Sequence, residues 1–422
     1  MRILIINKFL HPNGGSETYI LKLGAYLNSI GHEVQYFGME HEGRQVGNKV
    51  ESYTSDMDFH SGSKISKLFY PVKTIYSLEA RKKLRVILSD FNPEVVHLNN
   101  FNYQLTPSVI VEIVKWRRSE NRKCKIIYTA HDYQLICPNH LCHNPNTHEN
   151  CEKCLDGRFF NCMKGNCIHG SMARSAVGMA EAYFWRWRGI YKYIDKVICC
   201  SKFLKEKMES NEFFKNKTVI MRHFVDRSFV DDIDNVNIKN ISDISAGVLP
   251  EKYVFYFGRY AEEKGMGTLL KAIAEMPDIN FVFAGGGPFP VVDLKTGKKL
   301  PNLLEVGFQD GDRLKTFIKN ALFTILPSEW YEPFGLTIIE SQLLGTPVVG
   351  ADIGGISEII ENGKNGILFE SGNVKSLCKI VRRLWGDDCL IRELSNGCLT
   401  TPIENIECYC DKLIKIYKGI DL

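Results

Sequence analysis

Short apolar runs alternate with longer amphipathic stretches along most of the chain. In the first half, runs rich in β-branched and aromatic residues occur at residues 3–6, 33–38, 94–100, 125–132, 196–201 and 218–226. Helical stretches lie between them. Continuous apolar strands between helices are typical of a parallel sheet that helices cover on both faces. The pattern therefore predicts an α/β fold with ligands at the carboxyl ends of the strands, where His97, His131 and Asp132 lie.

The second half repeats the order of strand, glycine-rich loop and helix. Segments that begin as a strand-like run and end in glycine occur at residues 253–258, 281–287 and 324–335. Arg259 comes directly after the first of these segments. Lys264 follows a few residues later, just before a helical stretch over residues 265–276. Because 422 residues are too many for one ordinary hydrophobic core, we expect two domains.

A loop turns into a helix within residues 332–340. Pro333 and Gly335 hold the entry open, and no helix breaker follows within this stretch. The first turn of such a helix has unpaired N–H groups, here at Gly335, Leu336 and Thr337, beside the positive end of the helix dipole. The helix end therefore predicts a site for an anion such as a diphosphate.

Two carboxylates, Glu332 and Glu340, flank this helix end. Carboxylates are strong acceptors for sugar and ribose hydroxyls, so the pair suits a ligand that is part phosphate and part polyhydroxyl. The alternative is a negative charge at the start of an ordinary surface helix. For two glutamates alone, this alternative is the better interpretation.

Gly14 and Gly15 lie in the loop between the first strand and the helix that follows it. They let the backbone approach a ligand closely, and Asn13 and Ser16 are both suitable caps for the helix. No G-x-G-x-x-G follows this strand, which argues against a dinucleotide-dependent dehydrogenase.

Six segments that span most of residues 253–370 occur in the order of one enzyme family: GR…EEKG, AGGGP, VGF, EPFGLTIIE, GTPVV and GGISEII. With these motifs the chain resembles the retaining glycosyltransferases of family four. The resemblance implies the GT-B architecture, in which two Rossmann-like doubly wound domains face each other across a cleft. It divides the chain into an N-terminal acceptor-side domain, a linker, a C-terminal nucleotide-sugar-binding domain and a last helix that packs back on the first domain, at residues 1–226, 227–250, 251–400 and 401–422. Thr401-Pro402 marks the expected start of that helix.

The same resemblance implies a reaction. A sugar moves from a nucleoside-diphosphate sugar, in this family most often a uridine diphosphate (UDP) sugar, to a saccharide or lipid-linked saccharide, with retention of configuration. We expect a hexosyl- or N-acetylhexosaminyltransferase of cell-surface polysaccharide or glycolipid assembly. Competing interpretations are a sugar-nucleotide epimerase or a phosphorylase of the same architecture. A non-enzymatic one is a zinc-loop interaction protein on a degenerate scaffold.

Individual residues receive roles from this resemblance. Arg259 and Lys264 would stabilise the leaving diphosphate, because preorganised cations stabilise developing charge without reorganising. His131 would face the donor sugar, and Glu332 would hold its hydroxyls; these four are the predicted catalytic residues. The predicted nucleotide-sugar site further includes the Gly14-Gly15 loop over the phosphates, Glu340 at the ribose, backbone near Phe308 at the base, and Gly286, Phe334, Gly335, Leu336 and Thr337.

These cations would take the place of a divalent metal, so no catalytic metal is expected. Asp56-Met57-Asp58 has the D-x-D form of a metal-binding motif. It lacks a supporting strand, and we interpret it as a solvated loop.

An insertion at residues 137–169 is dense in cysteine and histidine. Two pairs, Cys151/Cys154 and Cys162/Cys167, have spacings that let a tight turn aim both sulfurs at one ion, and tetrahedral zinc needs four such ligands. We predict a structural zinc site made of these four cysteines, with Cys137 as the first substitute. Further donors are Cys142, His143, His148 and His169. The alternative is a set of free thiols in a loop on the acceptor side of the molecule.

Composition adds bounds on partners and location. Hydrophobic residues at 44% and charged residues at 24% are typical of a soluble globular protein, and a formal charge of +4 does not indicate nucleic acid as a partner. No apolar run approaches the ~20 residues that span a bilayer, and the segment MRILIINKF is too short for a secretory signal. We therefore expect a cytoplasmic protein whose 14 cysteines are thiols or metal ligands.

Residues 64–85 are rich in basic and aromatic side chains. Such a segment suits an anionic membrane surface, where each basic side chain contributes on the order of 1 kcal/mol. A solvated helix face explains the pattern equally well, and the family resemblance tips the choice toward peripheral binding at the inner face of the membrane. Residues 181–193 form a second aromatic and basic candidate, which reads equally well as a helix packed on the sheet.

Overall fold

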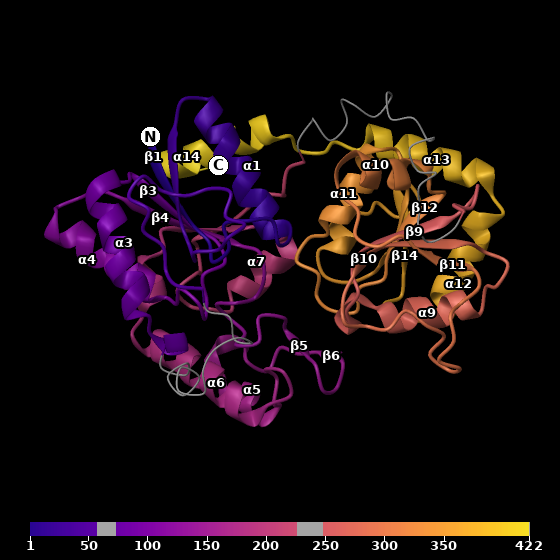
Figure 1. The fold of residues 1–422 in the computed structure, drawn as a ribbon, viewed down its shortest axis with the longest axis horizontal. Helices are drawn as coiled ribbons and strands as arrows, with labels where there is room; N and C mark the ends of the chain where they lie inside the picture. Colours follow the sequence, from indigo (N-terminus) through magenta and orange to yellow (C-terminus); the bar gives the residue numbers. More distant parts are fainter. Residues whose placement is uncertain (57–72, 226–247, 422) are drawn as a thin grey trace. The chain divides into compact units, whose positions relative to one another are not determined.

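The computed structural model describes residues 1–56, 73–225 and 248–421. Within it the chain forms two compact units (Figure 1). Unit 1 comprises Met1–Thr147, Cys151–Arg222 and Ile406–Leu422, and unit 2 comprises His148–Asn150 and His223–Asn405. The larger part of the expected linker lies outside the described residues, as do Asp58, Lys64 and Lys67.

Unit 1 contains a parallel sheet with the strand order β2-β1-β3-β4-β7-β8. Its strands are β1 (Arg2–Ile6), β2 (Glu33–Phe37), β3 (Val95–Leu98), β4 (Lys125–Ala130), β7 (Lys196–Cys199) and β8 (Thr218–Ile220). In the register of β1, Ile3 lies beside Val34 on one side and Val95 on the other. The apolar runs form strands because they are buried on both faces, where an unbroken row of hydrophobic side chains is favoured. β8 is shorter than the run at residues 218–226 predicts.

Helices cover both faces of this sheet. They are α1 (Gly15–Ser29), α3 (Leu78–Phe91), α4 (Ser108–Ser119), α7 (Lys202–Met208) and α14 (Ile406–Lys418). Two further helices, α6 (Met172–Trp187) and the short η2 (Ile190–Tyr193), follow the insertion, and α6 packs against it. The yellow helix α14 lies beside the indigo α1 in Figure 1. Tyr409 of α14 is fully buried, and its hydroxyl is 2.8 Å from that of Tyr19. The helix begins at Ile406, so the expected start near Thr401 is wrong: residues 402–405 are not helical.

The insertion follows the end of β4. Its elements are β5 (His143–Asn144), β6 (Glu149–Asn150), the short helix η1 (Leu155–Gly157) and α5 (Phe160–Lys164). Loops make up most of the remaining length.

Unit 2 contains a second parallel sheet with the order β11-β10-β9-β12-β13-β14. Its strands are β9 (Val254–Arg259), β10 (Phe281–Gly286), β11 (Leu303–Glu305), β12 (Phe323–Leu326), β13 (Val348–Ala351) and β14 (Gly366–Phe369). Its helices are η5 (Glu262–Lys264), α9 (Met266–Ala274), α10 (Gly311–Asn320), α11 (Leu336–Leu343), η6 (Ile356–Glu358), α12 (Val374–Trp385) and α13 (Asp388–Thr400).

Side chains of β9 alternate between two hydrophobic clusters. Val254 and Tyr256 belong to the cluster that includes residues of α9 and α12, whereas Phe255 and Phe257 pack with residues of α10. Figure 1 shows α9 and α12 on one side of this sheet and α10 and α11 on the other. The predicted α/β fold with doubly wound parallel sheets is confirmed.

Candidate functional site

Glu332 is the centre of a hydrogen-bonded group in unit 2. Its Oε2 accepts hydrogen bonds from Lys264 Nζ at 2.7 Å, Trp330 Nε1 at 2.9 Å and Ser328 Oγ at 3.1 Å. The ammonium of Lys264 also lies 4.9 Å from the centre of the Trp330 ring. Only 9% of Glu332 is exposed; Lys264 supplies the opposite charge, and all three donors hold the carboxylate in place.

Sheet order explains how distant residues meet here. Lys264 ends η5, which follows β9, and Glu332 lies in the loop that follows β12. β9 and β12 are neighbours, so their carboxyl ends share one edge of the sheet. The main-chain carbonyl of Glu263 joins the two loops, because it accepts hydrogen bonds from the amides of Glu329 at 3.0 Å and Trp330 at 3.1 Å.

Arg259 ends β9 at the same edge. Its guanidinium forms an ion pair with Glu263, and 59% of its side chain is exposed. Lys264 is less exposed, at 21%. The structure therefore brings Arg259, Lys264 and Glu332 to one edge, with Lys264 bound to Glu332 and Arg259 bound to the neighbouring Glu263.

Helix α11 begins next to Glu332. Gly335 precedes it with a φ of 112°, a backbone conformation that favours glycine, and contributes no side-chain cap. Leu336, Thr337 and Glu340 are half-buried and share one stripe of the helix, whereas Ile338 and Ile339 are buried. The amides of the first turn thus lie beside the half-exposed stripe that carries Glu340.

Gly354 and Gly355 pack closely against the main chain of the loop that carries Glu332. The amide of Gly355 donates to the carbonyl of Glu332 at 2.7 Å. A Cβ atom at Gly354 would lie 2.6 Å from that same carbonyl oxygen, and one at Gly355 would lie 2.5 Å from the carbonyl oxygen of Pro333. Only glycine therefore fits at either position without displacing the loop.

The other predicted residues of unit 2 differ in exposure. Gly286 ends β10, and a Cβ atom there would meet nothing within 4 Å. Phe308 is 78% exposed. Phe334 is buried, with its ring centre 5.3 Å from that of His223.

In unit 1, a polar network covers the carboxyl ends of β1, β3 and β4. Asn100 donates to Ser16 Oγ at 2.9 Å, next to Gly15, which begins α1. His131 Nε2 is 2.9 Å from Asn99 Oδ1, and its ring centre is 5.0 Å from that of Tyr19. The predicted Gly14-Gly15 loop and His131 therefore belong to one edge of this sheet.

His97 and Asp132 have different surroundings from His131. His97 is fully buried in β3, where its ring nitrogens are 2.6 Å from Tyr417 Oη and 2.7 Å from Thr129 Oγ1; burial lowers its pKa to about 3. Asp132 Oδ1 accepts from the amide of Gln134 at 2.8 Å, and burial raises the pKa of this carboxyl to about 6. His97 is thus a neutral part of the core, whereas Asp132 shapes the turn after β4.

Comparison with protein families covers both halves of the chain. The family model described as Glycosyltransferase Family 4 matches residues 13–229, and the model for glycosyl transferases group 1 matches residues 237–397. The chain belongs to glycosyltransferase family 4. The predicted enzyme class, a glycosyltransferase, is confirmed at this level.

Two relatives of this family 4 chain illustrate the range of similarity. An uncharacterised 42.6 kDa protein in the cps region of Klebsiella pneumoniae is 23% identical over 432 residues, 99% of this chain and 100% of the relative. Alpha-D-kanosaminyltransferase of Streptomyces kanamyceticus is 29% identical over 178 residues, 40% of this chain and 46% of the relative.

Solved structures show the same fold. Sucrose-phosphate synthase of Thermosynechococcus elongatus has a TM-score of 0.68 at 17% identity, with 99% of this chain and 98% of that chain covered. HepE of Anabaena in complex with UDP has a TM-score of 0.64 at 15% identity, with both chains fully covered. The fold of this family 4 chain is GT-B, as the motifs predict.

The zinc prediction for the family 4 chain is not supported. Among residues 1–56, 73–225 and 248–421, no group of three or more histidine, cysteine or acidic side chains is placed to hold a metal ion. Cys154 and Cys162 instead pack with Phe159 in a small apolar cluster, and Cys167 packs against that cluster. Cys151 is partly exposed. The four predicted ligands therefore do not form a metal site in the part of the chain that the structure describes.

Hydrogen bonding also separates the acidities of these thiols. The hydrogen bond from Cys162 lowers the pKa of Cys167 to about 7, and the same bond raises the pKa of Cys162 far above its ordinary value. Cys137 and Cys142 form a second such pair, in which the pKa of Cys137 is lowered and that of Cys142 is raised.

In the described part of the basic segment, two arginines form ion pairs with acidic side chains. Arg81 is 2.7 Å from Glu112 of α4, and Arg85 is 3.3 Å from Glu120. Lys82 and Lys83 are exposed on α3. In the part of the chain that the structure describes, no helix is long and apolar enough to cross a bilayer.

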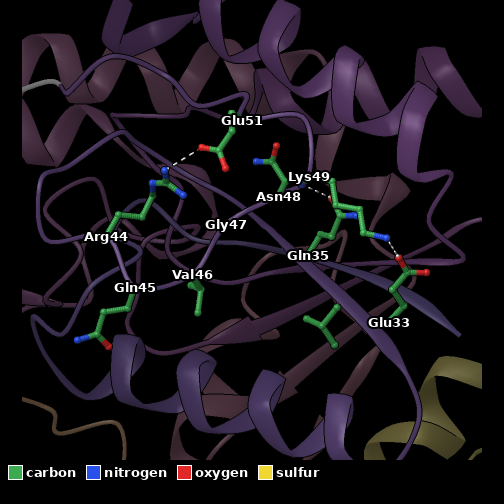
Figure 2. A pocket seen from close by; sticks show the side chains of 10 residues that line it. Glu33, Gln35, Arg44, Gln45, Val46, Gly47, Asn48, Lys49 and Glu51 are labelled. Atoms are coloured by element: carbon green, nitrogen blue, oxygen red, sulfur yellow. Dashed lines mark hydrogen bonds and ion pairs between the residues drawn. The ribbon is translucent and has the colours of Figure 1, made fainter.

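A surface depression of about 410 Å³ lies at the outer edge of the unit 1 sheet, beside β2 (Figure 2). Its charged side chains pair with each other: Lys49 is 2.6 Å from Glu33, and Arg44 is 2.9 Å from Glu51. None of the predicted site residues lines it. We assign no ligand to this depression.

Proposed function

We propose that this glycosyltransferase moves a sugar from a nucleoside-diphosphate sugar, in the first place a UDP-sugar, to a saccharide or lipid-linked saccharide acceptor, with retention of configuration. The observation that carries the proposal is the ion pair between Lys264 and Glu332, next to the N-terminus of α11, which has no side-chain cap. The solved complexes of HepE with UDP and UDP-glucose, and of Arabidopsis thaliana starch synthase IV with ADP and acarbose, support a nucleotide-sugar donor.

The cations and helix end of unit 2 suit a diphosphate. The amides of Leu336 and Thr337 lie in the first turn of α11, where the helix dipole favours an anion. Lys264 carries three N–H groups and gives one of them to Glu332, so two remain for phosphate oxygens. Arg259, with its exposed fork of donors, would bind a second phosphate oxygen pair.

Glu332 suits the hydroxyls of the donor sugar. The three hydrogen bonds that it receives from Lys264, Trp330 and Ser328 all end on Oε2. Oε1 is therefore the oxygen left to accept from a ligand. Glu340, one turn into α11 on its half-exposed stripe, would take the ribose hydroxyls, and backbone near Phe308 would meet the base.

In unit 1, the Gly14-Gly15 loop would cover the donor phosphates and His131 would face the donor sugar. Asn99 fixes the ring of His131 through Nε2. The loop is fixed in turn by the bond from Asn100 to Ser16. These contacts support fixed positions for the Gly14-Gly15 loop and for the His131 ring in the acceptor-side domain.

The proposed reaction needs no group beyond donor and acceptor. The bond between the anomeric carbon and the diphosphate oxygen breaks, and the acceptor oxygen forms the new bond from the same face of the sugar. The acceptor's proton passes to the departing diphosphate. Lys264, Arg259 and the α11 amides would stabilise the charge that develops on that leaving group.

The test is a panel of UDP-, GDP- and ADP-sugars, screened for binding and then incubated with lipid-linked saccharides and analysed by mass. We expect one nucleotide class to bind, and product to form only when an acceptor is present. If the donor is converted without an acceptor and without hydrolysis, the enzyme is instead an epimerase. None of the relatives described above supports that alternative.

We further propose that α3 contributes to peripheral membrane contact, in keeping with cell-surface polysaccharide or glycolipid assembly. Lys82 and Lys83 are exposed, and Leu78 and Val86 of the same helix are 63% and 49% exposed. Vesicles that contain an anionic lipid should bind the wild type more strongly than a Lys82→Glu, Lys83→Glu variant. Equal binding of both proteins would refute this contact.

A further inference from the structure

The loop that carries Glu332 lies against the segment that carries Lys264. Gly265, the residue after Lys264, has a φ of 74°, and a Cβ atom there would collide with the carbonyl oxygen of Pro327. Only glycine therefore fits at this position. The two segments are in direct main-chain contact at this point of unit 2.

Glu329, in the same loop as Glu332, is bound to the Lys264 segment at two places. Its amide donates to the carbonyl of Glu263 at 3.0 Å, and its Oε1 accepts from Thr268 Oγ1 at 2.6 Å. Glu263 and Thr268 lie on either side of Lys264 in the chain. The main-chain bond and the side-chain bond of this one glutamate therefore bracket the lysine.

Thr268 is a buried residue of α9. It lies in the first turn of the helix and is 6% exposed. Its hydroxyl has one hydrogen to donate, and the carboxylate of Glu329 is nearer than the other acceptor, the Gly372 carbonyl at 3.5 Å. Hydrogen bonds to a carboxylate are among the stronger ones in proteins. Thr268 thus ties the side chain of Glu329 to the start of α9.

We infer that Thr268 and Glu329 are positioning residues. Their hydrogen bond holds the Glu332 carboxylate at its place beside Lys264, an inference that rests on the function proposed above. Trp330, the residue after Glu329, donates to Glu332 Oε2 at 2.9 Å. Loss of the bond between Thr268 and Glu329 frees this part of the loop and changes the direction of the indole N–H. Small displacements of binding groups slow a reaction even when every reacting group is present.

The alternative is that the bond only stabilises the fold. Thr346 is the matched control, because it is also a buried threonine of unit 2, at 2% exposure, and its hydroxyl donates to the carbonyl of Ile318 at 2.8 Å. Thr268→Val and Thr346→Val each remove one buried hydroxyl and keep the branched shape of the side chain. Both lower the free energy of unfolding, so an effect that follows stability alone appears in both variants.

The experiment uses the full chain with ¹⁵N-labelled tryptophan. The chain has five tryptophans, and Trp330→Phe identifies the indole N–H signal of Trp330 in the NMR spectrum. We expect this signal to shift in Thr268→Val, to return in Thr268→Ser, which restores the hydroxyl, and to stay in place in Thr346→Val. A Trp330 signal that does not move in Thr268→Val would overturn the inference.

Transfer kinetics with the donor identified by the nucleotide-sugar screen give the second readout. In Thr268→Val and in Glu329→Ala, kcat should fall roughly tenfold. The double variant should lose no more than either single variant, because the two residues act through one bond. Thr346→Val should retain the wild-type kcat, and additive losses or an equal loss in Thr346→Val would contradict the inference. If the wild type transfers no sugar from any nucleotide sugar, the proposed function fails, whereas the tryptophan signal still decides whether the bond positions the loop.

Discussion

At the scale of single residues, the Trp330 indole is one of three donors that orient the Glu332 carboxylate. Trp330 donates to Oε2 and also lies beneath the Lys264 ammonium. Trp330→Phe keeps the ring and removes the N–H, so the carboxylate loses one of the donors that hold it. Hydrogen bonds to charged groups contribute ~1.5–3 kcal/mol, so kcat/KM for the donor should fall roughly tenfold or more. Steady-state kinetics at varied donor concentration measure this effect.

Trp385 provides the control for that variant. Its ring also lies under a lysine, with Lys252 Nζ 5.2 Å from the ring centre, but it is in α12, which packs against α9, α13 and β14. Trp385→Phe should leave kcat/KM unchanged. If both tryptophan variants lose activity equally, the loss reflects stability and not the hold on Glu332.

Lys264 is expected to act on turnover. Lys264→Ala removes one of the two cations proposed to bind the leaving group and leaves Glu332 without its ion-pair partner. By analogy with the loss of one preorganised donor, kcat should fall on the order of 100-fold. Glu340→Ala, in contrast, should mainly raise KM for the donor, because a ribose contact is made in the ground state and the transition state alike. Identical effects on kcat and KM in both variants would contradict the separate roles.

Much of this residue set could be predicted, but its contacts could not. Lys264, Glu332 and the start of α11 follow from motifs and helix-breaking residues that are local in sequence. The bond from Trp330 to Glu332 could not be read from spacing, because loop residues two apart have no fixed relative direction. The contact of Gly354 with the Glu332 carbonyl is set by the meeting of two loops, which periodicity does not encode. Cysteine spacing likewise suggested four zinc ligands, whereas Cys154 and Cys162 pack in an apolar cluster.

At the scale of elements, the loop that carries Gly354 positions the loop that carries Glu332. Gly354 has a φ of 60° and its Cβ would collide with the Glu332 carbonyl, whereas Gly363 has a φ of 84° and nothing within 4 Å. Gly363→Ala should cost only the backbone strain, about 1–2 kcal/mol. Gly354→Ala should cost roughly 3 kcal/mol and should also weaken donor binding. Denaturant unfolding and donor titration of both variants measure the difference; equal donor binding would show that the two loops are independent.

Helix α6 carries a buried acid whose protonation should affect stability. Glu181 is 2% exposed, its Oε1 has no hydrogen-bond partner among the described residues, and burial raises its pKa to about 8. Because the folded pKa is above the unfolded value of about 4.5, the folded state retains the proton and stability falls as pH rises from about 4.5 to 8. Glu181→Gln should remove this loss and raise the free energy of unfolding at pH 8 by about 2–4 kcal/mol.

Glu112 gives the matched comparison for that prediction. It is buried as well, at 5% exposure, but it pairs with Arg81 at 2.7 Å. Glu112→Gln should therefore lower stability at neutral pH, the opposite sign to Glu181→Gln. Chemical denaturation at pH 5 and pH 8 separates the two. A Glu181→Gln variant whose stability follows the wild type at both pH values would show that the carboxyl is solvated.

At the scale of the whole molecule, the C-terminal helix α14 belongs to unit 1, together with the N-terminal half of the chain. α14 places Tyr409, Cys410 and Leu413 in the core of unit 1 with no exposed surface, and Tyr417 is 2.6 Å from the buried His97. The pattern of the last residues predicted this helix but not its first residue. Thr401-Pro402 is typical of a helix start, yet α14 begins at Ile406. Deletion of residues 406–422 should unfold unit 1, whereas Tyr417→Phe should cost only about 1 kcal/mol. Thermal unfolding followed by near-UV circular dichroism measures both, and a deletion variant with native melting would contradict this role.

The central claim is that Lys264 and the end of α11 bind the diphosphate of a nucleotide sugar. Calorimetric titration of the wild type and Lys264→Ala with UDP and with uridine tests it most directly, because the two ligands differ only in the diphosphate. We predict that the wild type binds UDP more tightly than uridine and that Lys264→Ala loses affinity for UDP alone. Equal affinity of both proteins for UDP, in a variant that is folded, would contradict the account.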